Sequence, residues 1–418
     1  MSKIIKKYND TSLILRIVIG LAIGTVLGLI VPNLPVIPLF GAVFVGALKA
    51  IAPILVFVLV ISSLAHGNTG FDRRFGSVIF LYLLSTLLAG IVAVTASFLF
   101  PLTVKLPGSA DVSSAPSGVG EVLQNLIVSM VGNPVSSLGN ANYISILFWA
   151  VLLGIVFKKI ASKETRQVIA DLADAVSMLV SWIIAFAPFG IMGLIYETIS
   201  VSGLSIFIDY GKLLLLLVGT MLVVALVLNP LLVFLSIHAN PYPLVLRCLR
   251  ESAFMAFFMR SSAANIPVNM KLCEKLGLDR DIYSVSIPLG STINMDGAAV
   301  VITIMTMTAA NTVGIKVDIP SAIVLSLLAT LAACGTSGVA GGSLLLIPMA
   351  CSLFGIPQDT AMAMVGVGYI INVVQDSFET ALNSSGDVLF TATAEYRYWR
   401  KTGKSMPTFL GGTTKVDI

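Results

Sequence analysis

Residues 260–267 read RSSAANIP and residues 334–343 read CGTSGVAGGS, and each run interrupts a long apolar stretch near its middle. The two stretches cover residues 244–275 and 319–356. A continuous lipid-facing helix would not tolerate either interruption, because unpaired backbone groups are costly in hydrocarbon. The sequence therefore predicts two re-entrant helical hairpins, whose tips are buried in protein or line a wet cavity.

The composition indicates that most of the chain lies in lipid. Of 418 residues, 57% are hydrophobic and 11% are charged, whereas a soluble domain carries about 25% charged residues. The net charge of +4 is too small to indicate a nucleic-acid partner. No prosthetic group or transition-metal site is predicted, because the four cysteines form no CxxC pair and the histidines, His66 and His238, lie far apart.

Outside the hairpins, apolar runs predict eight membrane crossings. They cover residues 13–31, 40–66, 75–101, 143–160, 166–199, 207–237, 282–310 and 359–392. Lys and Arg gather in the tails and in alternate connections, so the positive-inside rule places both termini in the cytoplasm. Residues 102–142, rich in Ser, Gly, Pro and Val, are predicted to be an exposed connector on the other side. The hairpins then enter from opposite sides, and this inverted repeat points to a transporter with a site near the midplane.

The last predicted span carries a polar helical face. The face comprises Asn372, Asp376, Thr380, Asn383 and Asp387. A carboxylate at bilayer depth costs roughly 2.5–3.5 kcal/mol or more, so it needs a partner or a cavity. Glu379 lies one position off this face. The alternatives to a binding site are a carboxylate cluster at the membrane surface and a proton relay.

The preceding span contains residues 290–297, GSTINMDG. Gly290 and Gly297 permit unwinding, which would free carbonyl oxygens, and Asn294 and Asp296 add side-chain oxygens. Hard oxygen ligands around a buried carboxylate suit an alkali cation. The alternative is a helix kink with a capping Asn-Asp pair.

Two further groups carry weaker signals. Ser261 and Ser262 at the first tip, with backbone N–H groups, could meet an anionic group at a helix amino end, or simply form a polar helix end. Tyr82, Ser85 and Thr86 share one face of the third span. By itself, this pattern is typical of an aromatic side chain in a membrane helix, next to hydroxyl groups that bond to the backbone of the same helix.

At these motifs the sequence resembles the dicarboxylate/amino acid:cation symporter family, which has the glutamate-transporter fold. The similarity covers nearly the whole chain. Its specific parts are residues 260–262, residues 294–297, the glycine-rich tip 335–343 and the pattern from Asp376 to Asp387. Within the family the chain is most similar to the bacterial carriers of serine and threonine, with RSSAANIPVN at 260–269 and ETALNSS at 379–385.

The resemblance implies an all-α polytopic membrane protein with eight transmembrane helices, two re-entrant hairpins and inverted repeats. It implies import of serine and threonine by symport with Na⁺ as the coupling ion, by a homotrimer in the bacterial cytoplasmic (inner) membrane. It also implies an elevator mechanism. The expected parts are a scaffold (1–74 and 143–206), an extracellular loop (102–142), a transport domain (75–101, 207–240 and 241–392) and a cytoplasmic tail (393–418).

The resemblance further implies roles for single residues. Asp376 would bind the α-ammonium of the substrate, and Thr380 would line its side-chain pocket. Asn383 would hold the α-carboxylate, helped by Ser262 and backbone N–H groups near Gly338, and Ser261 is a further substrate-binding candidate. One sodium site would use carbonyls of Gly290 and Asn383 with side chains of Asn294 and Asp387. A second would use Tyr82, Ser85, Thr86, Asn294 and Asp296, and a third the carbonyls of Thr292, Ala333, Cys334 and Thr336.

Two positions depart from the family pattern. Members selective for acidic substrates carry arginine where this chain has Glu379, and proline where it has Ala340. An arginine fork binds a carboxylate bidentately, whereas a glutamate repels it and can accept a hydrogen bond from a hydroxyl. Arg260 at the facing tip is the candidate partner for Glu379. The alternatives are a sodium-coupled carrier of other neutral or acidic amino acids, a channel and an intramembrane enzyme, but Ser261 and Ser262 lack a nearby base.

Overall fold

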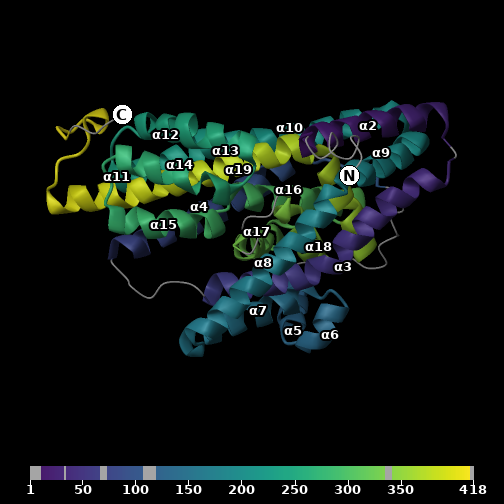
Figure 1. Ribbon diagram of the computed structural model, residues 1–418, viewed down its shortest axis with the longest axis horizontal. Coiled ribbons are helices and arrows are strands. Elements are labelled where there is room, and N and C mark those ends of the chain that lie inside the picture. The colour runs from purple at the N-terminus through teal and green to yellow at the C-terminus, as the bar shows by residue number, and fades with distance from the viewer. Residues whose placement is uncertain (1–10, 33, 66–72, 107–118, 335–340, 415–418) are drawn as a thin grey trace.

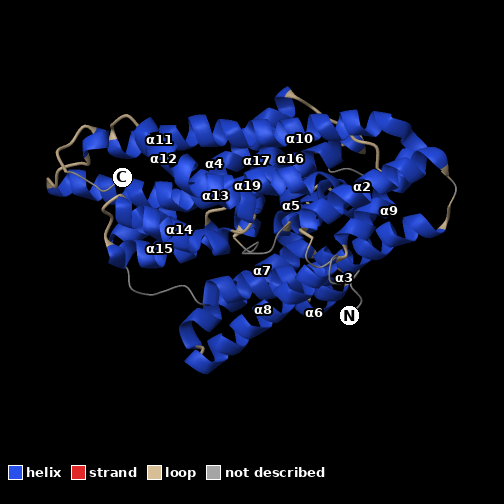
Figure 2. Cartoon of the chain, turned by 45° about the horizontal axis from the view of Figure 1, so that its top comes forward, coloured by secondary structure: helices blue, strands red, loops and turns tan. Residues whose placement is uncertain are grey.

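A computed structural model describes residues 11–32, 34–65, 73–106, 119–334 and 341–414, and these form helices joined by short connections (Figures 1 and 2). The amino-terminal half contains α2 (Leu13–Ile30), α3 (Val36–Ala65), α4 (Arg73–Leu99), α5 (Val119–Met130), α6 (Pro134–Gly139), α7 (Tyr143–Ile160), α8 (Lys163–Ala185) and α9 (Ala187–Ser202). A 3₁₀ turn, η1 (Gly203–Ser205), leads to α10 (Ile206–Val223), the π-helix η2 (Val224–Leu228) and α11 (Asn229–Ile237). The remainder contains α12 (Tyr242–Cys248), the π-helix η3 (Leu249–Ala253), α13 (Phe254–Met259), α14 (Ser262–Lys275), α15 (Arg280–Ile293), α16 (Asp296–Thr312), α17 (Ile319–Ala333), η4 (Gly342–Leu346), α18 (Ile347–Ser352), α19 (Gln358–Thr402) and η5 (Thr408–Leu410).

Seven helical segments of the described chain are long and apolar enough to cross a membrane. They are Val36–Ser62, Arg74–Leu99, Tyr143–Ile160, Lys163–Ala185, Ile206–Ile237, Arg280–Thr312 and Gln358–Thr402. The expected class, an all-α polytopic membrane protein, is therefore confirmed. The count of eight stays a prediction, because the first expected span is a shorter apolar helix, Leu15–Ile30.

Two expected segments differ from the structure. The span expected at 166–199 divides at Phe186 into α8 and α9, where Pro188 near the start of α9 has no N–H to donate. The connector expected at 102–142 contains α5 and α6. Helix α5 packs against α7, because its sequence VGEVLQNLIVSM is amphipathic.

The helices form two groups. Helix α2 packs along α9, and α3 packs against α7, α8 and α9. In the other group α16 lies between α4 and α19, and α17 packs against α4. Figure 1 shows α2 and α9 together at the end opposite the carboxyl terminus, while α11, α12, α14 and α15 gather near that terminus.

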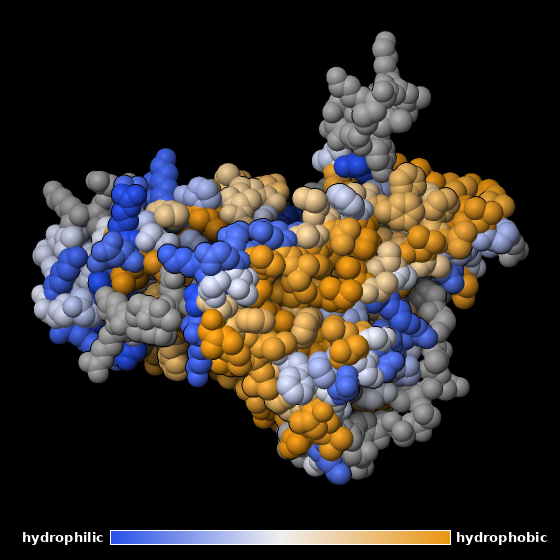
Figure 3. Space-filling model, turned by 60° about the horizontal axis from the view of Figure 1, so that its bottom comes forward, coloured by the Kyte–Doolittle hydropathy of each residue, from blue (hydrophilic) through white to orange (hydrophobic). Residues whose placement is uncertain are grey.

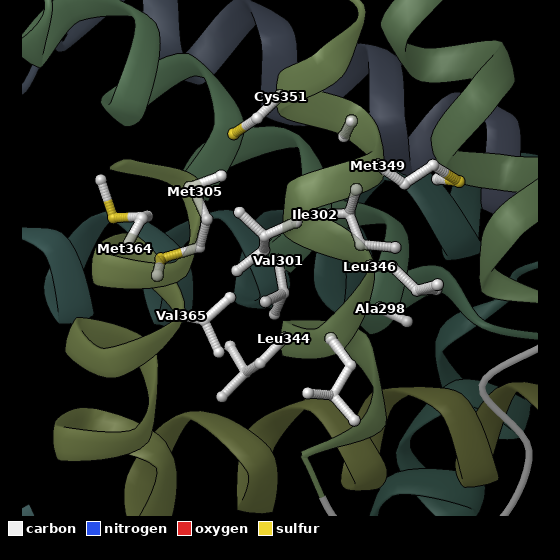
Figure 4. Packing of buried hydrophobic residues seen from close by; sticks show 14 of the residues in the cluster. Ala298, Val301, Ile302, Met305, Leu344, Leu346, Met349, Cys351, Met364 and Val365 are labelled. Atoms are coloured by element: carbon white, nitrogen blue, oxygen red, sulfur yellow. The ribbon is translucent and has the colours of Figure 1, made fainter. Parts of the chain in front are cut away.

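The centre of the second group is the buried helix α16. Figure 4 shows Ala298, Val301, Ile302 and Met305 of α16 facing residues of η4, α18 and α19. Gly368 allows α19 to pack closely against η4, since a Cβ at this position would lie 2.6 Å from a methyl carbon of Leu344. Because lipid is as apolar as these side chains, close packing rather than exclusion of water holds such helices together.

The surface is dominated by apolar side chains. Figure 3 shows them across the middle of the molecule, with hydrophilic residues concentrated at the end that carries the carboxyl terminus. Large apolar side chains are widely exposed, for example Leu215 at 73% and Val201 at 83%. Such a surface fits a protein whose solvent is lipid.

Both expected hairpins contain a helix break. The first falls only at Arg260 and Ser261, between α13 and α14, so the break expected over 260–267 is wrong for its last six residues. Pro267 is accommodated inside α14. The second hairpin breaks between α17 and η4, and its tip, residues 335–340, lies outside the described residues.

Candidate functional site

Four elements converge on one buried polar region: the gap between α15 and α16, the middle of α19, the middle of α4 and the tip of the first hairpin. Helix α15 ends at Ile293 and α16 begins at Asp296. Asn294 and Met295 between them have non-helical backbone angles. The predicted unwinding is therefore present, although it is confined to two residues.

Asp387 of α19 is fully buried beside this gap. Its Oδ1 accepts a hydrogen bond of 3.0 Å from Asn294 Nδ2, which also donates to the Asn383 carbonyl at 2.9 Å. Gly290 lies so close that a Cβ there would be 2.8 Å from Asp387 Oδ1. Asp387 Oδ2 is buried and has no hydrogen-bond partner among the described residues. An unpartnered buried carboxylate oxygen beside carbonyl groups fits a cation better than it fits a closed hydrogen-bonded core.

Asp296, also fully buried, forms a second group at the start of α16. Its Oδ1 accepts hydrogen bonds from Ser85 Oγ at 2.8 Å and from Thr86 Oγ1 at 3.1 Å. Its Oδ2 accepts one from Asn229 Nδ2 at 3.3 Å. Ser85 Oγ also lies 3.4 Å from Asn294 Oδ1, so Ser85 and Asn294 together link Asp296 to Asp387.

Tyr82 lies between the Asp387 group and the Asp296 group, and its hydroxyl bonds on the Asp387 side. The hydroxyl donates to the Asp387 carbonyl at 2.9 Å and lies 2.8 Å from Thr391 Oγ1. The Tyr82 carbonyl lies 3.0 Å from Ser85 Oγ and 2.9 Å from Thr86 Oγ1, so it shares the single proton of each hydroxyl with Asp296. Helix α4 thus supplies hydroxyls and a carbonyl to the same polar region.

The third expected group is described only in part. Cys334, which ends α17, lies with its Sγ 3.8 Å from the Ile293 carbonyl at the end of α15. Thr292 and Ala333 occupy the last turns of these two helices, whereas Thr336 lies outside the described residues. Two helix carboxyl ends that meet in this way favour a cation, because both present partial negative charge.

Asp376 accepts hydrogen bonds from residues of both expected hairpins. Its Oδ2 accepts a hydrogen bond from Arg260 Nε at 2.7 Å, in a salt bridge whose side chains are 6% and 10% exposed. Its Oδ1 accepts the N–H of Gly341 at 3.3 Å. The carboxylate therefore already binds a cation of the chain itself.

Glu379 lies one turn further along α19 and is also buried. Its Oε2 accepts hydrogen bonds from Ser343 Oγ at 2.8 Å and from Gln375 Nε2. The expected partner Arg260 pairs instead with Asp376, so that expectation is wrong for this conformation. Glu379 Oε2 instead accepts hydrogen bonds from uncharged groups of Ser343 and Gln375. Within the described chain no partner bonds to Glu379 Oε1.

The remaining predicted substrate residues line the same region. Asn383 Oδ1 accepts the N–H of Gly297 at 2.7 Å, and among the described residues its Nδ2 meets only the weak acceptor Met295 Sδ at 3.5 Å. Ser261 caps α14 by accepting the Ala264 N–H at 3.2 Å, which is the structural alternative considered for it. Ser262 and Thr380 are buried. Gly338, like Ala340, lies outside the described residues.

Sequence reasoning missed several residues of the site. Asn229, Ser343 and Gln375 bond to the predicted carboxylates. Asn229 carried the clearest signal, because it is an amide followed by proline inside a long apolar run. Gln375 lies four positions before Glu379 on one helix face, which periodicity alone could have shown.

A second missed network joins the first hairpin to α19. Asn265 Nδ2 lies 2.8 Å from Ser384 Oγ, and Asn269 Nδ2 donates to the Ser384 carbonyl at 3.0 Å. Ser252 Oγ donates to Asn269 Oδ1 at 2.5 Å. All four side chains are fully buried, so both arms of the hairpin are tied to the turn that carries Asn383.

Comparison with known proteins gives one consistent result. Residues 13–396 match the model of the sodium:dicarboxylate symporter family. The serine/threonine transporter SstT of Bifidobacterium adolescentis is 59% identical over 403 residues, covering 96% of this chain and 94% of that protein. The proteins of the same name from Streptococcus thermophilus (54%; 96% and 100% covered) and Streptococcus agalactiae (55%; 94% and 98% covered) are similarly close.

Proposed function

The chain belongs to the sodium:dicarboxylate symporter family, and from that premise we propose that it imports serine and threonine together with sodium ions. Relatives that are 54–59% identical carry the name serine/threonine transporter. The observation that carries the sodium part is the unpartnered, fully buried Asp387 Oδ2 beside the α15–α16 gap. As a symporter the protein is a transporter and not an enzyme.

The charges of the site support sodium coupling. Asp296, Asp376, Glu379 and Asp387 are all buried, and within the described chain only Arg260 forms a salt bridge with any of them. Buried carboxylates need compensating positive charge. Sodium ions at three sites would supply it. The site at Asp387 would use Gly290, Asn294, Asn383 and Asp387, and the site at Asp296 would use Tyr82, Ser85, Thr86, Asn294 and Asp296. The third, at the carboxyl ends of α15 and α17, would use Thr292, Ala333, Cys334 and Thr336.

The substrate would bind between the tips and α19. Asp376 would take the α-ammonium, and Asn383 would turn its weakly used Nδ2 to the α-carboxylate, with Ser261, Ser262 and backbone N–H groups near Gly338. Thr380 would line the side-chain pocket. Asn383 would thereby exchange a weak contact with Met295 Sδ for a stronger one to the ligand, whereas Asp376 would exchange its salt bridge with Arg260 for one with the ammonium.

Specificity for a hydroxyl would come from Glu379. Ser343 and Gln375 occupy its Oε2, so the carboxylate is held in one orientation with Oε1 left for a substrate hydroxyl. A site built to bond a hydroxyl rejects an analogue that lacks it. Negative charge at this position also disfavours aspartate and glutamate, which argues against the acidic-substrate alternative.

The arrangement of helices supports the remaining parts of the proposal. Eight crossings with two re-entrant hairpins in inverted repeats, and both termini in the cytoplasm of a bacterial inner membrane, fit the positive-inside pattern. The group α2, α3, α7, α8 and α9 would be the scaffold of a homotrimer. The group around α16 and α19 would be the transport domain that moves as an elevator.

Uptake of radiolabelled serine into proteoliposomes tests the proposal. An inward sodium gradient should drive accumulation of serine and threonine, whereas a proton gradient alone should not. Serine entry that proceeds equally without sodium would refute sodium symport. Preferential accumulation of aspartate would refute the assigned substrate.

Cysteine-accessibility labelling in a cysteine-free background tests the topology. A cysteine at residue 163 should react from the cytoplasm, and one at residue 111 from outside. Residue 111 lies outside the described chain but tests the sidedness of the connector. The reverse pattern, or a cysteine at residue 320 reached only from inside, would contradict the eight-span arrangement.

A further inference from the structure

Arg260 makes the closest charge contact of the candidate substrate site. Its Nε lies 2.7 Å from Asp376 Oδ2, and the two side chains are 10% and 6% exposed. The other oxygen of Asp376 accepts the Gly341 N–H from the second hairpin at 3.3 Å. A single carboxylate thus bonds both to the first tip and to Gly341, which precedes η4.

The backbone of the first tip holds Arg260 in this position. Arg260 has φ of 50°, in the left-handed region, and its N–H bonds to the Ala256 carbonyl at the end of α13. A residue with a Cβ adopts that conformation at a cost of roughly 1–2 kcal/mol. Ser261 then starts α14 by capping it, so the arginine lies at the turn itself and points across to α19.

Resting on the proposed function, we propose that Arg260 acts as an internal substitute for the α-ammonium of the substrate. In the empty carrier its guanidinium neutralises Asp376 and holds the first tip against α19. When serine binds, its ammonium takes the place of the guanidinium on Asp376, and Arg260 withdraws. Arg260 is therefore a residue that sets affinity and permits return of the empty carrier, and it is not a contact of the bound substrate.

The electrostatics explain why such a device is useful. A buried carboxylate without a counter-charge is strongly unfavourable, so an empty site with Asp376 unpaired would tend to stay open to water. A carrier that must return empty needs a closed state without substrate. The same pairing lowers apparent affinity, because only the fraction of molecules with Asp376 released can bind serine.

Two variants separate charge from hydrogen bonding. Arg260→Gln keeps a donor and removes the charge, whereas Arg260→Lys keeps the charge. Arg250→Ala is the matched control, because it removes a cation from the same hairpin at a side chain that is 73% exposed and bonded only to Glu251. Serine binding to purified protein, serine–serine exchange and net sodium-driven uptake are measured for each in proteoliposomes.

Arg260→Gln should bind serine about tenfold more tightly, as expected if roughly one molecule in ten of the wild type has Asp376 released. Exchange, which needs no empty return, should stay near the wild-type rate, while net uptake should fall several-fold. Arg260→Lys and Arg250→Ala should resemble the wild type. Weaker serine binding in Arg260→Gln, or equal loss of exchange and net uptake, would overturn the proposal.

The wild type gives a second test if Arg260→Gln does not assemble. Modification of Arg260 by phenylglyoxal, followed by peptide mass spectrometry, should be faster with saturating serine and sodium than with sodium alone. Slower modification with serine would show that Arg260 stays in place or contacts the substrate. Failure of wild-type protein to accumulate serine would instead refute the proposed function, so the two failures are distinguishable.

Discussion

Replacement of Asp387 by asparagine tests the cation site most directly. Oδ1 can remain an acceptor for Asn294 Nδ2, but the unpartnered Oδ2 becomes an NH₂ group that repels a cation. Truncating one partner of a buried charge pair costs about 2–5 kcal/mol. The lower figure already corresponds to a roughly 30-fold loss of sodium affinity.

Thermal unfolding with and without sodium measures this loss independently of transport. At a sodium concentration 100 times the wild-type Kd, bound sodium stabilises the protein by about 2.7 kcal/mol. A 30-fold weaker site would leave about 0.9 kcal/mol at the same concentration. Without sodium, Asp387→Asn should be at least as stable as the wild type, because an uncompensated buried charge is gone.

Asp359→Asn is the matched control, since Asp359 lies on the same helix with its side chain 77% exposed and paired with Lys49 at 2.6 Å. It should keep the full sodium-induced stabilisation. If Asp387→Asn also keeps it, or if sodium-dependent serine uptake is unchanged, Asp387 does not ligate sodium and the reasoning fails.

Three further changes have defined outcomes. Asp376→Asn should lower serine affinity by roughly 30-fold or more, seen by calorimetry on protein that still purifies folded; a change within a few-fold would remove Asp376 from the site. Ser343→Ala and Glu379→Gln should each reduce the preference for serine over alanine in competition assays, because Glu379 loses its orientation or its charge; an unaltered preference would show that neither selects the hydroxyl. Gly297→Ala should abolish uptake, because the new Cβ would lie 2.9 Å from the backbone of Glu379. Gly211→Ala is the control, because a Cβ there would have nothing within 4 Å. Normal uptake by Gly297→Ala would contradict the close packing of α16 on α19.

Periodicity and polarity predicted much of the site. The spacing of Asp376, Asn383 and Asp387 on one helix, and of Ser85 and Thr86 on another, is local information that a helix converts into a common face. The gap at Asn294 followed from flanking glycines and polar residues that hydrocarbon would not tolerate. These expectations needed no knowledge of how distant segments meet.

Contacts between segments that are distant in the sequence were harder to predict. Charge alone gave no reason to prefer Glu379 over Asp376 as the partner of Arg260, since both carboxylates lie on α19 one turn apart. The hydroxyl of Ser343 and the amide of Asn229 come from elements far from Glu379 and Asp296 in sequence. Their roles depend on side-chain directions after packing.

The sequence by itself determined the class of protein, the interruptions of its two apolar stretches and the helix faces that carry its polar groups. Those features follow from the cost of exposing polar backbone and charge to lipid, which acts on each segment separately. Only the tertiary structure decided that one carboxylate, Asp376, bonds to both Arg260 and Gly341, and that Asp387 Oδ2 has no hydrogen-bond partner among the described residues. Such pairings depend on ångström-scale distances between helices, and helix packing sets those distances where local periodicity cannot.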